Sequence, residues 1–247
     1  MDTIRRRSVL AALGGIAVTG HSQTLVDQTS AYLKPSSRIW LMGPEEDPEF
    51  GKVISGGAPV GTAPSRHDEI TTAFRLHFDA PRGKDPITTA QYYAGITKKN
   101  ADNELYNQEW KVRSNPLITG LFGFTGTAPA EGDQTPWCAA FVSFCLYLCD
   151  LPNKFTALSG GYRNFGNDVA ANPHPGDLAV FALNGSKGQK GFGHVAFFVE
   201  ETVKGGVPGI LCLGGNQAGS TRSTGAVTEA WFPKEGKDMY LHGLRRG

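Results

Sequence analysis

Hydrophobic positions in the middle of the chain follow a helical period. Between Thr135 and Asp150 the apolar side chains recur every three or four residues, at Ala140, Phe141, Phe144, Cys145 and Leu148. Thr135 can cap a helix, and Pro136 suits its first position because proline lacks the N–H that is unpaired there. Pro152 cannot continue it. The pattern predicts a helix over 135–150 with one apolar face.

Beyond this helix the pattern changes to short apolar runs bounded by glycines, which predict strands. The runs cover 176–181, 194–200 and 210–215, with weaker ones at 226–232 and 239–244. We interpret these runs as strands of an antiparallel sheet.

Two helical patterns precede the central helix. The first begins at Ser65, a possible cap, and carries a partly apolar face of Ile70, Phe74, Leu76 and Phe78. The second runs from about residue 86 to 110, with a possible break at Gly95 or at 101–103. We expect both to support the sheet.

The first residues are typical of an export signal. Arg6 and Arg7 precede an apolar stretch, 9–18, that is too short for a stable membrane anchor. The segment 1–22 resembles a twin-arginine signal, which predicts a periplasmic or secreted protein. An ordinary secretory signal or a basic tail remains an alternative. Residues 23–64 are rich in Gly, Pro and Ser and predict an extended arm, and 65–247 form the predicted folded domain.

The composition is that of a globular protein and argues against nucleic acid and membranes as partners. The 247 residues are 40% hydrophobic and 19% charged, with a formal net charge of +1. Such a chain lacks the basic excess that attracts nucleic acid. No second apolar stretch is long enough to cross a bilayer, so no membrane span is expected after signal cleavage.

The chain contains four cysteines, which could form two disulfides in an exported protein. Cys145 and Cys149 lie four apart, so on a helix they share one face and are most simply small buried residues. Their spacing, without a matching His or Cys cluster, does not predict zinc. We expect no metal and no cofactor, while the disulfide state of Cys145, Cys149 and Cys212 stays open.

Cys138 lies near the predicted start of the central helix, in the stretch TPWCAAF. Unpaired N–H groups and the positive end of the helix dipole favour a thiolate there. The alternative is a small buried side chain. The nucleophile interpretation therefore needs a basic partner.

His194 is the best candidate for that partner, because it opens a predicted strand after a flexible glycine-rich stretch. Asn216 follows the next strand, and its amide oxygen could accept the second ring N–H of His194. The alternative for Asn216 is a turn residue in the sequence GGN.

Four segments, TPWCAAFVSF, HPGDLAVF, GHVAFFVE and LGGNQ, occur in an order that resembles papain-like cysteine peptidases of the NlpC/P60 and CHAP group. The resemblance covers about 115–247 and implies an α+β fold, with the nucleophile helix packed on an antiparallel sheet. It implies a Cys138, His194 and Asn216 triad, with Trp137 beside the thiol at the substrate site or as a core anchor. CHAP enzymes often carry a Glu two residues before the Asn, where this chain has Gly214.

The resemblance further implies hydrolysis of a peptide or amide bond in peptidoglycan through an acyl-enzyme. Two other functions remain open. One is a non-catalytic module that binds the cell wall or a partner on the same fold, and the other is an acyltransferase or transpeptidase. If the protein were a delivered toxin, an immunity protein would be a further partner.

Overall fold

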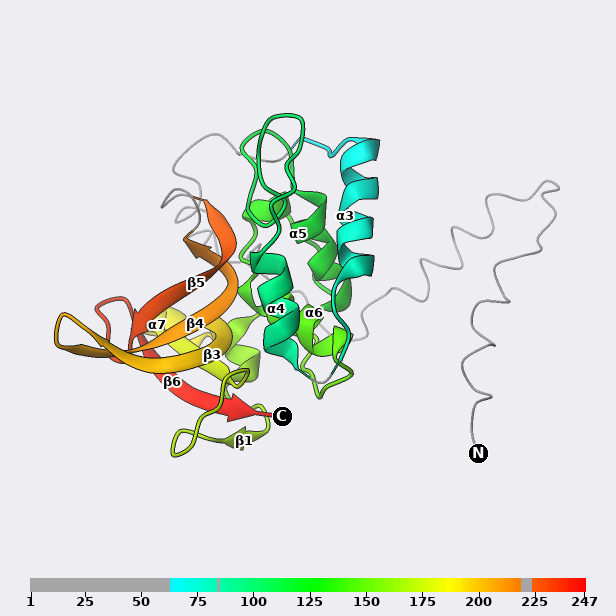
Figure 1. Cartoon of the computed structure of the whole chain (residues 1–247). Coiled ribbons are helices and arrows are strands. Elements are labelled where there is room, and N and C mark those ends of the chain that lie inside the picture. Colours follow the sequence, from blue (N-terminus) through cyan, green and yellow to red (C-terminus); the bar gives the residue numbers. More distant parts are fainter. Residues whose placement is uncertain (1–62, 84, 219–223) are drawn as a thin grey trace, which may run out of the picture. The chain divides into compact units, whose positions relative to one another are not determined.

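A computed structural model describes residues 63–83, 85–218 and 224–247. The predicted signal 1–22 and nearly all of the predicted arm 23–64 lie outside these ranges. Figure 1 shows helices α3 to α6 gathered on one side of a curved sheet. Within the described ranges, no helix is long and apolar enough to cross a membrane.

The helices precede most of the sheet in the sequence. The α-helices are α3 (His67–Asp79), α4 (Pro86–Ala94), α5 (Pro116–Leu121), α6 (Cys138–Leu148) and α7 (Ser186–Gln189), with short 3-10 turns η4 (Phe122–Phe124), η5 (Gly132–Gln134) and η6 (Ser159–Tyr162). The strands are β1 (Asn167–Asp168), β2 (Leu178–Leu183), β3 (Gly193–Lys204), β4 (Val207–Ala218), β5 (Gly225–Pro233) and β6 (Met239–Arg246).

These strands form one six-stranded sheet in the order β1-β6-β2-β3-β4-β5. Every pairing is antiparallel. All five strands expected from the apolar runs are present, and β1 is a short addition at the edge. The predicted α+β fold, a helix on an antiparallel sheet with extra N-terminal helices, is confirmed.

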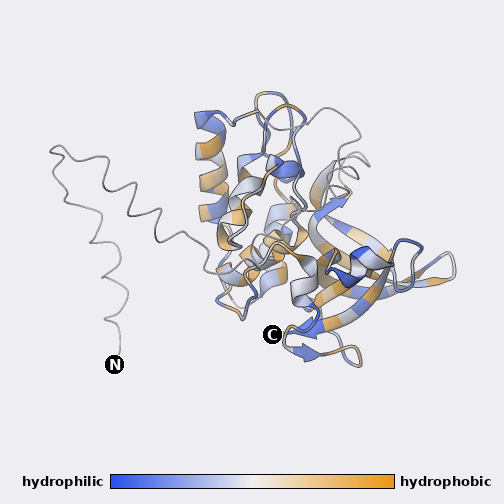
Figure 2. Cartoon of the chain, turned by 180° about the vertical axis from the view of Figure 1, so that it is seen from behind, coloured by the Kyte–Doolittle hydropathy of each residue, from blue (hydrophilic) through white to orange (hydrophobic). Residues whose placement is uncertain are grey.

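The first helix differs from its prediction in both its cap and its face. α3 begins at His67, and Ser65 donates to the carbonyl oxygen of Ser114 instead of capping the helix. Phe74 and Phe78 are 70% and 78% exposed, and Ile70 is 38% exposed, so of the expected apolar face only Leu76 packs against the core. Figure 2 shows orange bands between blue ones along this helix. The helix is held from its other side by Glu69, which is buried against Arg113.

The second predicted helix is much shorter than the pattern indicated. α4 ends at Ala94, with Gly95 as its cap, and most of the chain from there to α5 is loop and turn. Part of this loop pairs with the sheet: the Glu109 N–H donates to the Gly225 carbonyl at 2.8 Å, and the Val227 N–H donates to the Asn107 carbonyl at 2.8 Å. This segment therefore extends the sheet beside β5.

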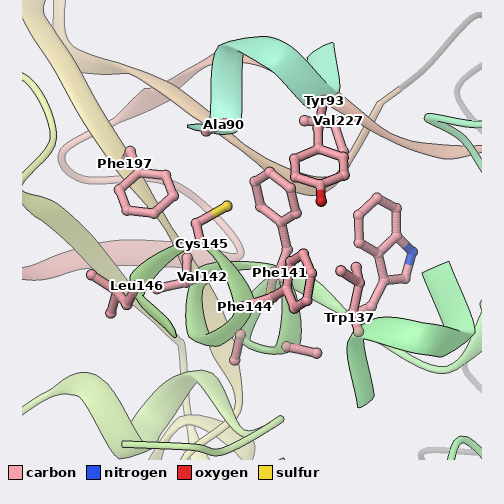
Figure 3. Close-up of a cluster of buried hydrophobic side chains, with 14 of the residues drawn as sticks. Ala90, Tyr93, Trp137, Phe141, Val142, Phe144, Cys145, Leu146, Phe197 and Val227 are labelled. Atoms are coloured by element: carbon pink, nitrogen blue, oxygen red, sulfur yellow. The ribbon is translucent and has the colours of Figure 1, made fainter. Parts of the chain in front are cut away.

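The central helix α6 begins at Cys138, later than predicted. Thr135 is not its cap, because its hydroxyl accepts from the Glu131 N–H. Tyr147 is the only helix residue that is exposed. A helix that is apolar on all sides belongs in a core, and here α4 and α5 cover the side that β3 and β4 leave open. Figure 3 shows α6 side chains packed with those of α4 and β3.

The sheet has a second apolar cluster on the face turned away from α6, which we call the inner face. Its buried members are Ala179, Phe181, Ala196, Phe198, Ile210, Cys212 and Leu244. Phe181 on β2 lies 5.1 Å from Phe232 on β5, ring centre to ring centre, although two strands separate them in the sheet. The sheet therefore curls around the inner face, and this explains why both faces of β2 are buried.

All four cysteines are free and buried. The interpretation of Cys145 and Cys149 as small buried residues is confirmed, and Cys149 also lies 3.3 Å from the Thr89 hydroxyl. The open question of two disulfides is answered for this structure, which contains none among the residues it describes.

Candidate active site

Cys138 is the first residue of α6 and only 5% exposed. Burial raises the pKa of its thiol, while the N–H groups of Val195, Ala139 and Cys138 itself lower it. The expectation that the helix start favours a thiolate is therefore wrong for the structure as it stands, because desolvation outweighs the donors. Cys138 is a neutral thiol at neutral pH.

His194 is the second residue of β3 and is 8% exposed. Its ring lies on the inner face, 5.1 Å from the Phe232 ring and 6.5 Å from the Phe181 ring, centre to centre. Burial lowers the pKa of His194 to about 4, and a hydrogen bond with Gln217 acts in the opposite direction. The imidazole is therefore neutral at neutral pH and able to accept a proton.

Gln217 determines which ring nitrogen accepts that proton. The Nε2 atom of His194 lies 3.1 Å from Gln217 Oε1. The Gln217 amide nitrogen faces the carbonyl oxygens of Cys212 and Thr228, so its orientation is fixed and Oε1 must accept. His194 therefore carries its proton on Nε2, which leaves the lone pair on Nδ1, the ring nitrogen nearer the main chain.

The expected acceptor, Asn216, does not make this bond, and a β-bulge explains why. Gly214 pairs with Thr228 and Gln217 with Ala226, so β4 has one more residue than β5 between these pairs. Asn216 takes up the extra residue with φ of 57°, in the left-handed region that asparagine tolerates. The bulge shifts by one residue the alternation of β4 side chains between the two faces of the sheet. Gln217 therefore points toward His194, and the Asn216 side-chain oxygen lies against Gly225.

The structure brings Cys138 to the main chain of His194 but not into a hydrogen bond with its ring. The Val195 N–H, the amide directly after His194, is close enough to the Cys138 thiol to lower its pKa. Val195 belongs to the cluster around α6, whereas the His194 ring contacts the inner face. Among the described residues, no hydrogen bond joins the Cys138 sulfur to the imidazole. Such bonds are often long or misaligned without substrate and tighten when it binds.

Trp137, expected either at the substrate site or as a core anchor, lies in the core and is 0% exposed. Its indole N–H donates to Glu109 at 3.1 Å. Glu109 also accepts from the Gly225 N–H at 2.7 Å, so one carboxylate joins the start of α6 to the start of β5. Burial raises the pKa of Glu109, and these two hydrogen bonds lower it.

Two acidic residues near the site have structural roles. Asp133, just before α6, is buried and accepts from the N–H groups of Trp110 and Asn115. Burial raises its pKa to about 7. Asp177 is also buried and forms a paired contact with Arg246 at 2.6 Å, which fixes the end of β6 beside β2.

Sequence reasoning missed Gln217 and Glu109. Gln217 directly follows the GGN turn signal, which could have indicated a bulge and hence a shift of the alternation by one residue. Glu109 gave no signal, because its partners Trp137 and Gly225 are distant in the sequence.

The fold and the position of Cys138 define a papain-like α+β protein, in which a helix headed by cysteine packs on an antiparallel sheet. Residues 130–216 match the CHAP domain, a family of papain-like cysteine amidases and peptidases. Residues 130–216 thus form a CHAP domain, as the sequence resemblance indicated, and such a domain implies a cysteine hydrolase of the cell-wall type. No curated protein and no solved structure matches the chain significantly.

Proposed function

We propose that the protein hydrolyses a peptide or amide bond of peptidoglycan, with Cys138 as nucleophile, His194 as base and Gln217 as the residue that orients His194. The observation that carries this proposal is the fixed Gln217 amide, which leaves Nδ1 as the basic nitrogen of a neutral imidazole. The amide of Val195, directly after His194 in the chain, also lies close to the Cys138 sulfur. In this proposal Gln217 takes the orienting role that we expected for Asn216.

Because both the thiol and the imidazole are neutral, proton transfer accompanies the attack. Cys138 Sγ bonds to the substrate carbonyl carbon while its proton moves to His194 Nδ1. The N–H of Cys138 has no partner within the helix at this first position, so it can donate to the developing oxyanion. The C–N bond then breaks, and the Nδ1 proton leaves with the amine.

Water completes the cycle. It attacks the thioester carbonyl and gives a proton to His194 Nδ1. The C–S bond breaks, and the sulfur recovers the proton from His194 as the carboxylic acid product leaves. Gln217 keeps the ring in one tautomer through both half-reactions.

The proposal includes export, since peptidoglycan lies outside the cytoplasmic membrane. Arg6 and Arg7 before a short apolar stretch support a twin-arginine-like signal. A fusion of residues 1–22 to a reporter that is active only after export would test this. Export that persists when both arginines are replaced by lysine would contradict a twin-arginine route.

The decisive experiment is digestion of purified peptidoglycan by the wild type and by Cys138→Ala, with mass analysis of the fragments. We expect new amine and carboxyl ends from the wild type alone. Fragment masses also separate hydrolysis from transfer, because transfer joins a second amine to the acyl group. Equal digestion by the wild type and by Cys138→Ala would contradict the proposal. So would the absence of digestion by a folded wild type.

A further inference from the structure

An apolar groove lies among the helices, outside the residues assigned above. It has a volume of about 570 Å³ and is bounded by α3, α5 and the last turn of α6. Figure 1 shows α3 at the outer edge of the helices, away from the sheet. Tyr147 lines the groove and lies nine residues after Cys138 in α6, which is about 14 Å along the helix axis. The groove is therefore separate from the proposed active site.

Several side chains that line this groove are left in water. Phe74 and Phe78 on α3 are 70% and 78% exposed, and Ile70 is 38% exposed. Tyr147 on α6 is 48% exposed. Because these four side chains line one groove, they form a single apolar surface in which exposed rings stand beside a hollow. A second copy of the chain can place its own rings in that hollow, so the surface is complementary to itself.

The spacing of the apolar residues along α3 suits a two-fold axis. Ile70 and Phe78 lie four residues before and after Phe74, so all three are on the same side of the helix. An axis through Phe74, perpendicular to α3, makes the helices of two copies antiparallel. It pairs each Ile70 with the partner's Phe78, and the two Phe74 rings with one another. Each contact is then made twice, as in any interface between identical surfaces.

The exposed aromatic area is sufficient for such an interface. An aromatic side chain has roughly 150–250 Å² of surface to bury. At their exposures, Phe74, Phe78 and Tyr147 therefore offer about 400 Å² in each copy, or about 800 Å² in two copies. Ile70 and the remaining lining bring the total near the roughly 1,000 Å² that a specific interface needs.

A second copy fits this groove better than a small polar ligand does. Small-molecule sites orient their ligands with a few polar groups inside an apolar pocket. Here both ring nitrogens of His77 already have hydrogen-bond partners, and the hydroxyls of Ser65 and Thr119 donate to main-chain carbonyl oxygens. The Arg82 guanidinium is exposed and lies 5.9 Å from the centre of the Phe78 ring. A charged group beside an apolar centre is usual at the rim of a protein interface.

We propose that this groove is the interface of a two-fold dimer, in which the partner's Phe74 and Phe78 enter the hollow beside α3. The dimer buries aromatic surface that a single copy exposes, and this burial is the main source of its stability. Because the groove is separate from Cys138, each copy keeps its own site. The inference does not depend on the proposed function.

The test is sedimentation velocity of the full chain over a range of concentrations. We expect a monomer–dimer equilibrium with a Kd in the micromolar range, since the area is at the low end for specific interfaces. Phe74→Glu should raise this Kd by about 30-fold or more, because it removes a central contact and brings two carboxylates together at the axis. The matched control is Val203→Glu on β3, where the valine is 62% exposed, and its Kd should equal that of the wild type.

Crosslinking tests the position of the axis independently. Phe74→Cys should give a disulfide-linked dimer on oxidation, because the axis brings position 74 of the two copies together. The four native cysteines are buried and do not compete. Val203→Cys is the control and should crosslink far more slowly. Well below the dimer Kd the protein is monomeric, so unfolding measured there does not include the interface.

Three results would overturn the proposed dimer. A full chain that remains monomeric at millimolar concentration leaves the groove to another occupant, either a segment outside the described residues or a different protein. A dimer whose Kd is unchanged by both Phe74→Glu and Phe78→Glu uses another surface. Crosslinking of Phe74→Cys that is no faster than that of Val203→Cys rules out an axis through Phe74.

Discussion

The environment of a single sulfur determines how Cys138 should react. Its pKa is raised because burial outweighs three N–H donors. We therefore expect iodoacetamide to label it slowly at neutral pH and faster as the pH rises. Mass spectrometry of the labelled peptide would check this, with Cys138→Ala to identify the site. Rapid labelling at pH 7 would instead show a preformed thiolate and imidazolium pair.

Gln217 and Asn216 are adjacent, yet we expect very different effects from their replacement. Gln217→Ala removes the acceptor that fixes the His194 tautomer, and kcat should fall by about 10- to 10,000-fold, as for other orienting residues. Asn216→Gly keeps the positive φ of the bulge and should leave kcat within a few-fold of the wild type. Steady-state kinetics on a soluble stem peptide would compare them. A greater loss from Asn216→Gly would return the orienting role to Asn216.

At the scale of the helix, the burial of a phenylalanine, rather than its hydrophobicity alone, determines how much it contributes to the free energy of unfolding. Phe141 on α6 is fully buried, whereas Phe74 on α3 is 70% exposed. Phe141→Ala should lower the free energy of unfolding by about 3–5 kcal/mol. Phe74→Ala should change it by less than about 0.5 kcal/mol. Urea unfolding of both variants measures the difference, and similar losses would contradict the exposed position of Phe74.

The start of α6 also supports the proposed site through its packing against β4. Trp137 packs on Phe141, and a Cβ on Gly215 would lie 2.4 Å from the indole. Gly215 therefore permits β4 to approach the start of α6 closely, directly before the bulge that positions Gln217. The indole bond to Glu109 then joins this contact to β5. Helix, bulge and loop thus hold Cys138 and Gln217 in one packed unit.

At the scale of the whole molecule, buried histidines should make stability depend on pH. His77 joins three helices, with its Nδ1 3.0 Å from the Tyr93 hydroxyl and its Nε2 3.1 Å from the Leu117 carbonyl. Burial lowers its pKa to about 4 from 6.5, although the bond to Leu117 raises it. Because the folded pKa is the lower one, the unfolded chain binds more protons between these values, and stability is lost as the pH falls from about 6.5 to 4.

We therefore expect the free energy of unfolding of the wild type, relative to that of His77→Gln, to fall by up to about 1.4 kcal/mol per pH unit in this window. Chemical unfolding at several pH values would measure the slope. His194 and Asp133 also titrate abnormally, but their contributions are common to both proteins and cancel. Parallel pH curves for the two proteins would contradict a half-buried His77 that is neutral in the folded protein.

The sequence by itself determined the order of the elements and indicated two members of the proposed site. Period and glycine boundaries located α6 and five strands, because these patterns reflect local burial that any compact fold must satisfy. Cys138 at a helix start and His194 at a strand start were recognisable for the same reason. Phe74 and Phe78 show the limit, since their spacing indicated a packed face that the tertiary structure leaves exposed.

Only the tertiary structure decided the partner of His194 and the charge of Cys138. A bulge of one residue brings Gln217 rather than Asn216 to the His194 ring, and this bulge depends on pairing between β4 and β5 that the order of residues does not reveal. The thiol pKa depends on how much protein surrounds the sulfur, and the helix start alone predicts the opposite direction. Both depend on contacts between segments distant in the chain, which no local pattern records.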